Sequence, residues 1–92
     1  MYVLIRVDGD EASGSSIRMM AASESLSEVR NMMIDEYEAE YEHPSNSWLD
    51  AWDEEYCFTD DMNAACQTEC LEYVAEWFIF DTDNMAGFDL AI

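Results

Sequence analysis

Apolar and polar residues alternate with a period of two near the start of the chain. In YVLIRV (2–7), β-branched residues occupy the odd positions, whereas Leu4 and Arg6 fall on the opposite side of an extended backbone. This alternation predicts a β-strand. IRMMAAS (17–23) predicts a second strand, and DGDEASGSS (8–16) is typical of a turn, because glycine tolerates positive φ and Asp and Ser bond back to the backbone. An antiparallel hairpin is therefore expected.

One register of this hairpin aligns its apolar residues. Pairing Val7 with Ile17 places Ile5 opposite Met19, Val3 opposite Ala21 and Arg6 opposite Arg18. Like charges that face each other across a ladder are unfavourable. We therefore expect nearby carboxylates to neutralise the two arginines.

The pattern changes to a helical one at residues 26–42. SLSE (25–28) matches a capping box, in which Ser25 accepts from the amide of Glu28 and the Glu28 side chain reaches back to the Ser25 amide. Apolar residues then recur at helical spacing: Leu26, Val29, Met33, Tyr37 and Tyr41. Pro44 forbids continuation. This segment predicts an amphipathic helix whose apolar face packs on the sheet.

The remaining residues predict further strands. Trp48 and Trp52 are four apart, which is compatible with a short helical turn over the edge of the core. Residues 62–77 fit either a helix or a strand at 66–74 followed by another strand, and we favour the strands. Residues 76–81 are apolar on both faces of the pleat, which predicts a central strand covered on each side.

These elements predict a single α+β domain over residues 1–92, with a small antiparallel sheet packed against one helix. The sheet would contain the N-terminal hairpin and one or more C-terminal strands. The chain has 22 acidic and three basic side chains, a formal net charge of −19 and no lysine, yet half of its residues are hydrophobic. That hydrophobic fraction predicts a folded core. The charge should weaken the compact state by self-repulsion.

The acidic residues concentrate in two clusters. The helical cluster contains Glu28, Asp35, Glu36, Glu38, Glu40 and Glu42, and the second contains Asp50, Asp53, Glu54, Glu55, Asp60 and Asp61. Carboxylates late in a helix oppose its macrodipole, and like charges four residues apart repel. Local folding therefore disfavours this arrangement, which indicates an external role. We predict that both clusters contact a basic partner, with a carboxylate spacing comparable to that of DNA phosphates.

Candidate chemistry other than charge is weak. The chain lacks a lysine and a glycine-rich phosphate loop, and His43 has no evident nucleophile beside it, so we predict a protein that is not an enzyme. Cys57, Cys66 and Cys70 lack metal-binding spacing and are expected to be buried thiols, with no metal and no cofactor. DTDNMAG (81–87) is similar to the start of a calcium loop, but Met85 and Ala86 stand at key positions, which favours a turn.

The same composition bears on the location of the protein and on the cause of its acidity. No signal peptide or membrane-spanning stretch is evident, and the odd cysteine count suits a reducing compartment, so we expect a cytoplasmic protein. Adaptation to high salt is an alternative cause of the acidity. It predicts acids on every surface, whereas residues 1–23 hold only Asp8, Asp10 and Glu11. The clustering favours binding.

In size, acidity and α+β pattern the chain resembles small phage or mobile-element proteins that mimic the charge of DNA, notably the anti-CRISPR inhibitors of RNA-guided nucleases. The resemblance is carried by IDEYEAEYE (34–42) and WDEEYCFTDD (52–61) and by composition. It implies a non-catalytic inhibitor, acting in a bacterial host cell, that occupies the DNA-reading site of such an effector. Any exposed member of Tyr37, Tyr41, Trp48 and Trp52 would anchor the contact, although core roles are the simpler expectation.

The expected partner is thus a basic, nucleic-acid-binding protein rather than nucleic acid, because a charge of −19 repels phosphate. The protein itself is expected to be a monomer or a homodimer. The alternatives are a generic acidic interaction module for another basic protein and a weak calcium-binding domain.

Overall fold

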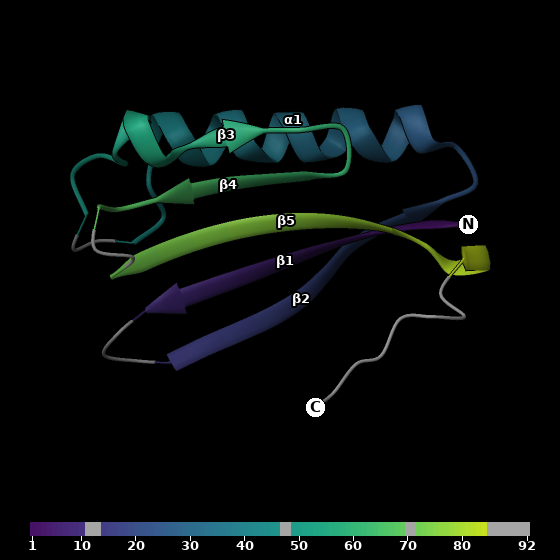
Figure 1. Cartoon of the computed structure of the whole chain (residues 1–92), viewed down its shortest axis with the longest axis horizontal. Helices are drawn as coiled ribbons and strands as arrows, with labels where there is room; N and C mark the ends of the chain where they lie inside the picture. Colours follow the sequence, from purple (N-terminus) through teal and green to yellow (C-terminus); the bar gives the residue numbers. More distant parts are fainter. Residues whose placement is uncertain (11–13, 47–48, 70–71, 85–92) are drawn as a thin grey trace.

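A five-stranded antiparallel sheet packed against one helix forms the structure (Figure 1). It is a computed structural model that describes residues 1–10, 14–46, 49–69 and 72–84. The elements are β1 (Tyr2–Asp10), β2 (Gly14–Ser23), α1 (Leu26–Glu42), η1 (Glu54–Tyr56), β3 (Phe58–Thr59), β4 (Asn63–Gln67), β5 (Tyr73–Asp81) and η2 (Thr82–Asn84). The strand order is β2-β1-β5-β4-β3. The α+β prediction is confirmed.

The hairpin of β1 and β2 has the predicted register over most of its length. Val7 pairs with Ile17 and Arg6 pairs with Arg18, but an irregularity between Leu4 and Ile5 shifts the pairing, so that Val3 opposes Ala22 rather than Ala21. A bulge of this kind places two residues of one strand against one of the other. Both strands extend further into the expected turn than predicted, and Gly14 has a positive φ of 86°.

Helix α1 begins and ends where the sequence predicts. The Ser25 hydroxyl accepts from the Glu28 amide at 3.3 Å. The reciprocal half of the expected capping box differs: Ser23 Oγ accepts from the Ser25 amide at 3.1 Å and donates to Glu28 Oε2 at 3.3 Å. A serine on the preceding strand thus links the helix N-terminus to β2.

The C-terminal third contains two strands and no long helix among its described residues. β4 spans Asn63–Gln67, so the expected strand at 66–74 is wrong in its bounds, and the alternative helix over 62–77 is wrong. β5 contains the predicted 76–81 strand but starts at Tyr73 and lies in the centre of the sheet. The short turn expected around Trp48 and Trp52 is instead η1, and Trp48 lies outside the described residues.

The core lies between α1 and one face of the sheet. Its fully buried side chains include Leu4 from β1, Val29 and Met33 from α1, Cys66 from β4 and Trp77 from β5. The predicted packing of the helix on the sheet is therefore confirmed. The prediction that β5 is covered on both sides holds on only one of them, because no described helix or second sheet covers the opposite face.

Candidate protein-interaction surface

The acidic stripe of α1 faces away from the core. Val29 and Met33 are fully buried, whereas Glu28, Asp35, Glu38 and Glu42 are exposed. At about 1.5 Å per residue, this stripe is about 21 Å long. Glu36 is half-buried beside it, and its Oε2 lies 3.7 Å from Nη1 of Arg6.

The second acidic cluster also lies at the surface. Five of its members are exposed, namely Asp50, Glu54, Glu55, Asp60 and Asp61. Asp53 is half-buried and caps η1, since its side chain accepts from the Glu55 amide at 3.2 Å. The cap explains why the chain makes its short turn there rather than at Trp52.

The fold brings the two acidic clusters together. At one end of α1, Arg30 Nε donates to the Asp61 carbonyl at 2.9 Å, and at the other, Trp52 Nε1 donates to the Glu40 carbonyl at 3.1 Å. Residues 52–61 therefore run alongside α1 in the opposite direction, and Thr59 of β3 lines one groove together with Arg30 and Ile34 of α1. We call the carboxylates of the two acidic clusters, without Glu40, the acidic face.

Glu40 does not belong to the acidic face, so its assignment as a partner-binding residue is withdrawn. Its exposed fraction is 4%. Its carboxylate accepts from Arg6 Nη2 at 2.6 Å, from the Ser45 hydroxyl and amide at 2.7 Å each, and from Trp52 Nε1 at 3.1 Å. Glu40 follows Met33 by seven residues, which is about two helical turns, so the two side chains lie on the same, inward side of α1.

Carboxylates neutralise the opposed arginines, as expected. Asp8 accepts from Arg6 Nε at 3.0 Å and from Arg18 Nη2 at 3.2 Å, so it bridges both guanidinium groups. Burial alone would lower the pKa of Arg6, but its bonds with Asp8 and Glu40 raise that pKa. Burial alone would raise the pKa of Glu40, yet its bonds from Ser45 and Arg6 hold it below the usual value. Both groups are therefore charged at neutral pH.

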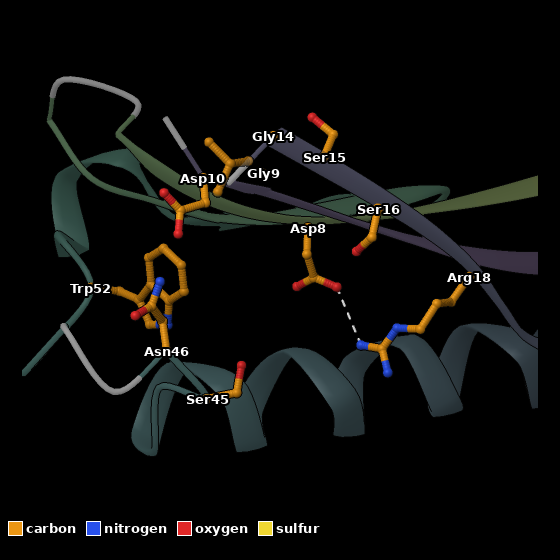
Figure 2. A pocket seen from close by; sticks show the side chains of 11 residues that line it. Asp8, Gly9, Asp10, Gly14, Ser15, Ser16, Arg18, Ser45, Asn46 and Trp52 are labelled. Carbon is orange, nitrogen blue, oxygen red and sulfur yellow. Dashed lines mark hydrogen bonds and ion pairs between the residues drawn. The ribbon is translucent and has the colours of Figure 1, made fainter. Parts of the chain in front are cut away.

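A cavity of ≈ 380 Å³ lies between the hairpin and the chain that follows α1 (Figure 2). Asp8 and Arg18 border it from the strands, and Ser45, Asn46 and Trp52 border it from the other side. Asp8 is held by two arginines, and the Ser45 hydroxyl donates to Glu40. These polar groups act as structural partners of one another.

The aromatic residues considered as anchors have core roles where the structure describes them. Trp52 is buried, and Tyr37 and Tyr41 are half-buried against the core with ring centroids 6.0 Å apart. Burial, together with the neighbouring Cys57 and Cys66, raises the pKa of Tyr37 to about 12. Trp48 lies outside the described residues. Charge, rather than an exposed aromatic among these three, characterises the acidic face.

The structure describes two of the three cysteines and the first four residues of the calcium-like segment. Cys57 and Cys66 are free thiols, Cys66 is fully buried, and burial raises its pKa. Cys70 and residues 85–87 lie outside the described residues. Asp81 Oδ1 accepts from the Asp83 amide at 3.0 Å, which is turn geometry. Within the described ranges, no group of three His, Cys, Asp or Glu side chains is arranged to hold a metal ion.

Sequence reasoning missed the inward role of Arg6 and Glu40. Arg6 is 6% exposed, and its guanidinium carbon lies 4.9 Å from the ring centroid of Trp77. Two sequence patterns could have predicted these inward positions. The alternation in β1 puts Arg6 on the same side as Leu4, and the spacing in α1 puts Glu40 on the same side as Met33.

Comparisons of the chain with protein-family models, with curated proteins and with solved structures find no match. In the part of the chain that the structure describes, no helix is both long enough and apolar enough to cross a membrane.

Proposed function

We propose that this protein is a non-catalytic inhibitor that binds the positively charged nucleic-acid site of a DNA-binding protein. The acidic face would occupy the positions that DNA phosphates take in such a site. RNA-guided nucleases are one class of effector with a site of this kind. The host-cell location and the mobile-element origin implied by the resemblance remain predictions.

The observation that carries this proposal is the side-by-side placement of the two acidic clusters. They are separate in sequence, yet the contacts from Arg30 to Asp61 and from Trp52 to Glu40 align them along one helix. Arg30 is the one arginine in these segments, and its Nε is bonded to a backbone carbonyl rather than to a carboxylate. The carboxylates of this surface therefore create a strongly negative field.

Such a field favours association with a basic groove. Complementary charge accelerates encounter, and the acceleration weakens with salt because the Debye length falls from about 10 Å at 0.1 M to about 3 Å at 1 M. Nucleic acid itself would be repelled. The same surface opposes the helix macrodipole at Glu42, so the protein retains charge there against its own helix stability.

The test is competition for an effector. The protein is titrated into a panel of DNA-binding effectors that includes RNA-guided nucleases, each holding labelled DNA, at low and at higher salt. Displacement from one effector, weakened by salt, supports the proposal and identifies the target. Equal and weak displacement from every basic protein contradicts it and favours a generic acidic module.

Charge reversal localises the effect to the acidic face. Glu38→Lys with Glu42→Lys should weaken displacement by about tenfold or more while the far-ultraviolet circular dichroism spectrum is unchanged. The matched control is Glu69→Lys with Glu72→Lys, because both are exposed, lie between β4 and β5, and change the net charge equally. An equal loss in both double variants would show that only the total charge matters. A thermal shift with calcium that magnesium does not reproduce would favour the calcium alternative.

A further inference from the structure

The sheet has a second surface, on the side opposite α1, that is apolar. Side chains paired across an antiparallel ladder lie on the same face. Trp77, Arg6 and Ala64 share the helix side, so the neighbouring cross-strand rows lie on the other side. One such row runs Phe58, Ala65, Glu76, Val7 and Ile17, and another runs Asn63, Phe78, Ile5 and Met19.

Large apolar side chains on this surface reach solvent. Ile17 and Met19 of β2 are each 71% exposed, and Phe58 of β3 is 40% exposed. Ile5, Val7 and Phe78 between them are half-buried. We call these six residues the open sheet face. Natural monomers seldom leave adjacent large apolar side chains this exposed unless they form an interface.

The open sheet face differs from the rest of the molecule in charge. Glu76 is the only charged side chain that the two described rows place there. The chain as a whole has a net charge of −19, and the acidic face belongs to α1 and residues 50–61. Two identical copies would repel strongly at most surfaces, but least where this face, with one charge in its described rows, meets itself.

From these observations we propose that two copies of this chain dimerise by packing their open sheet faces together. Face-to-face sheets lie about 10 Å apart. Each α1 would lie beyond its own sheet, so the acidic residues of the two helices would be separated by several Debye lengths of about 8 Å at physiological ionic strength. The dimer would hide the apolar surface and present an acidic face on each of two opposite sides.

The dimensions of the face suit such a contact. At about 3.3 Å per residue and about 4.8 Å between strands, the nine- to ten-residue strands β1, β2 and β5 span roughly 400 Å² in projection. β4 and β3 widen it, and accessible area exceeds projected area, so the face approaches the roughly 800 Å² per partner of a standard interface. Two identical copies that use the same face can also adopt the two-fold symmetry of most homodimers.

The test is the solution mass of the full chain, measured by sedimentation equilibrium over a range of protein concentration at low and high salt. We expect twice the chain mass at high concentration, with a dimer fraction that rises with salt because screening reduces repulsion between the copies. Binding to a basic effector weakens with salt, so the two associations respond in opposite directions. A wild-type chain that is monomeric at every salt concentration overturns the proposal and assigns the face to a different occupant.

Substitution decides whether the open sheet face is the interface. Met19→Glu should shift the dissociation constant by at least tenfold toward monomer, with an unchanged circular dichroism spectrum, because Met19 is exposed in one copy and would be buried in two. Met62→Glu is the matched control, since Met62 is also exposed but lies in the groove with Arg30 and Ile34 on the helix side. An unaffected dimer in Met19→Glu, or equal dissociation in both variants, overturns the proposal.

The dimer does not rest on the proposed inhibitory function. Met19→Glu leaves the acidic face intact, so its ability to displace DNA from an effector reports on that function separately. Loss of competition by Glu38→Lys with Glu42→Lys likewise leaves the open sheet face unchanged.

Discussion

The guanidinium of Arg6 is held in the core by three carboxylates and one aromatic ring. Its Nη2 lies 2.6 Å from Glu40, and its Nε lies 3.0 Å from Asp8. Glu40 in turn receives bonds from Ser45 and Trp52, which tie the loop after α1 to the helix. A buried charge is tolerated only when it is paired and bonded in this way, because desolvation is otherwise too costly.

Replacing Glu40 should therefore be costly at neutral pH. Glu40→Gln is expected to lower the free energy of unfolding by about 3 kcal/mol, near the lower end of the range for breaking a buried ion pair, since Arg6 keeps Asp8. Because the pKa of Glu40 is lowered on folding, its contribution is present above the unfolded pKa of about 4.3 and is lost as pH falls through the folded pKa. Urea unfolding at pH 7 and at steps below pH 5 measures this.

The control for this prediction is Glu38→Gln, which makes the same chemical change at an exposed position two residues away. It should leave the free energy of unfolding almost unchanged at pH 7. A destabilisation by Glu40→Gln that is the same at every pH would show that packing, not charge, accounts for the cost.

Helix α1 is the element in which helix stability and the proposed binding favour opposite charges. Its N-terminus is capped by Ser25 and has Glu28 in the first turn, both of which suit the helix dipole. Its last turn contains no basic residue and ends in Glu42, four residues after Glu38. The C-terminal half of α1 is thus charged in the way that least favours a helix.

Whether a charge reversal in α1 stabilises or destabilises the fold should depend on its position along the helix. Glu42→Lys is expected to raise the free energy of unfolding by about 0.5–1 kcal/mol, because it complements the dipole and removes an i,i+4 repulsion. Glu28→Lys relieves the same net charge but opposes the dipole and loses the bond from Ser23, so it should be neutral or destabilising. Urea unfolding of both variants at low salt measures the difference, and equal stabilisation at both ends would refute the dipole explanation.

At the scale of the whole molecule, two different surfaces lie on opposite sides of one sheet. The helix side contains most of the two acidic clusters, and the open sheet face contains exposed apolar side chains with one charge in its described rows. The three arginines bond within the protein, to Asp8, Glu36, Glu40 and the carbonyl of Asp61. The charge of −19 is therefore largely uncompensated.

Added salt should stabilise the fold. The free energy of unfolding is expected to rise with sodium chloride concentration, because screening reduces repulsion among exposed carboxylates more than it weakens the buried pair of Arg6 and Glu40. Urea unfolding at several salt concentrations, at a protein concentration where mass is constant, measures this. Glu69→Lys with Glu72→Lys should show a smaller salt dependence. A fold that loses stability with salt would indicate that ion pairs dominate instead.

Local patterns in the sequence predicted much of the fold. The hairpin, the bounds of α1 and the strand at 76–81 follow from periodicity, a cap and Pro44, which act over a few residues. The bounds of β4 were missed because residues 62–75 satisfy both helical and extended patterns. Strand pairing resolves such ambiguity: β4 forms its ladder with β5, the next strand along the chain, and β5 in turn pairs with β1 from the opposite end of the chain.

The sequence predicted an acidic surface, but it did not show which of the acidic residues lie on that surface. The amino-acid sequence alone determined the net charge and the two acidic clusters, from which a basic partner is predicted. Only tertiary structure decided that the clusters align along α1, that Glu40 is internal, and that one face of the sheet stays open. The physical reason is that charge and periodicity are properties of neighbouring residues, whereas burial depends on which distant segments meet.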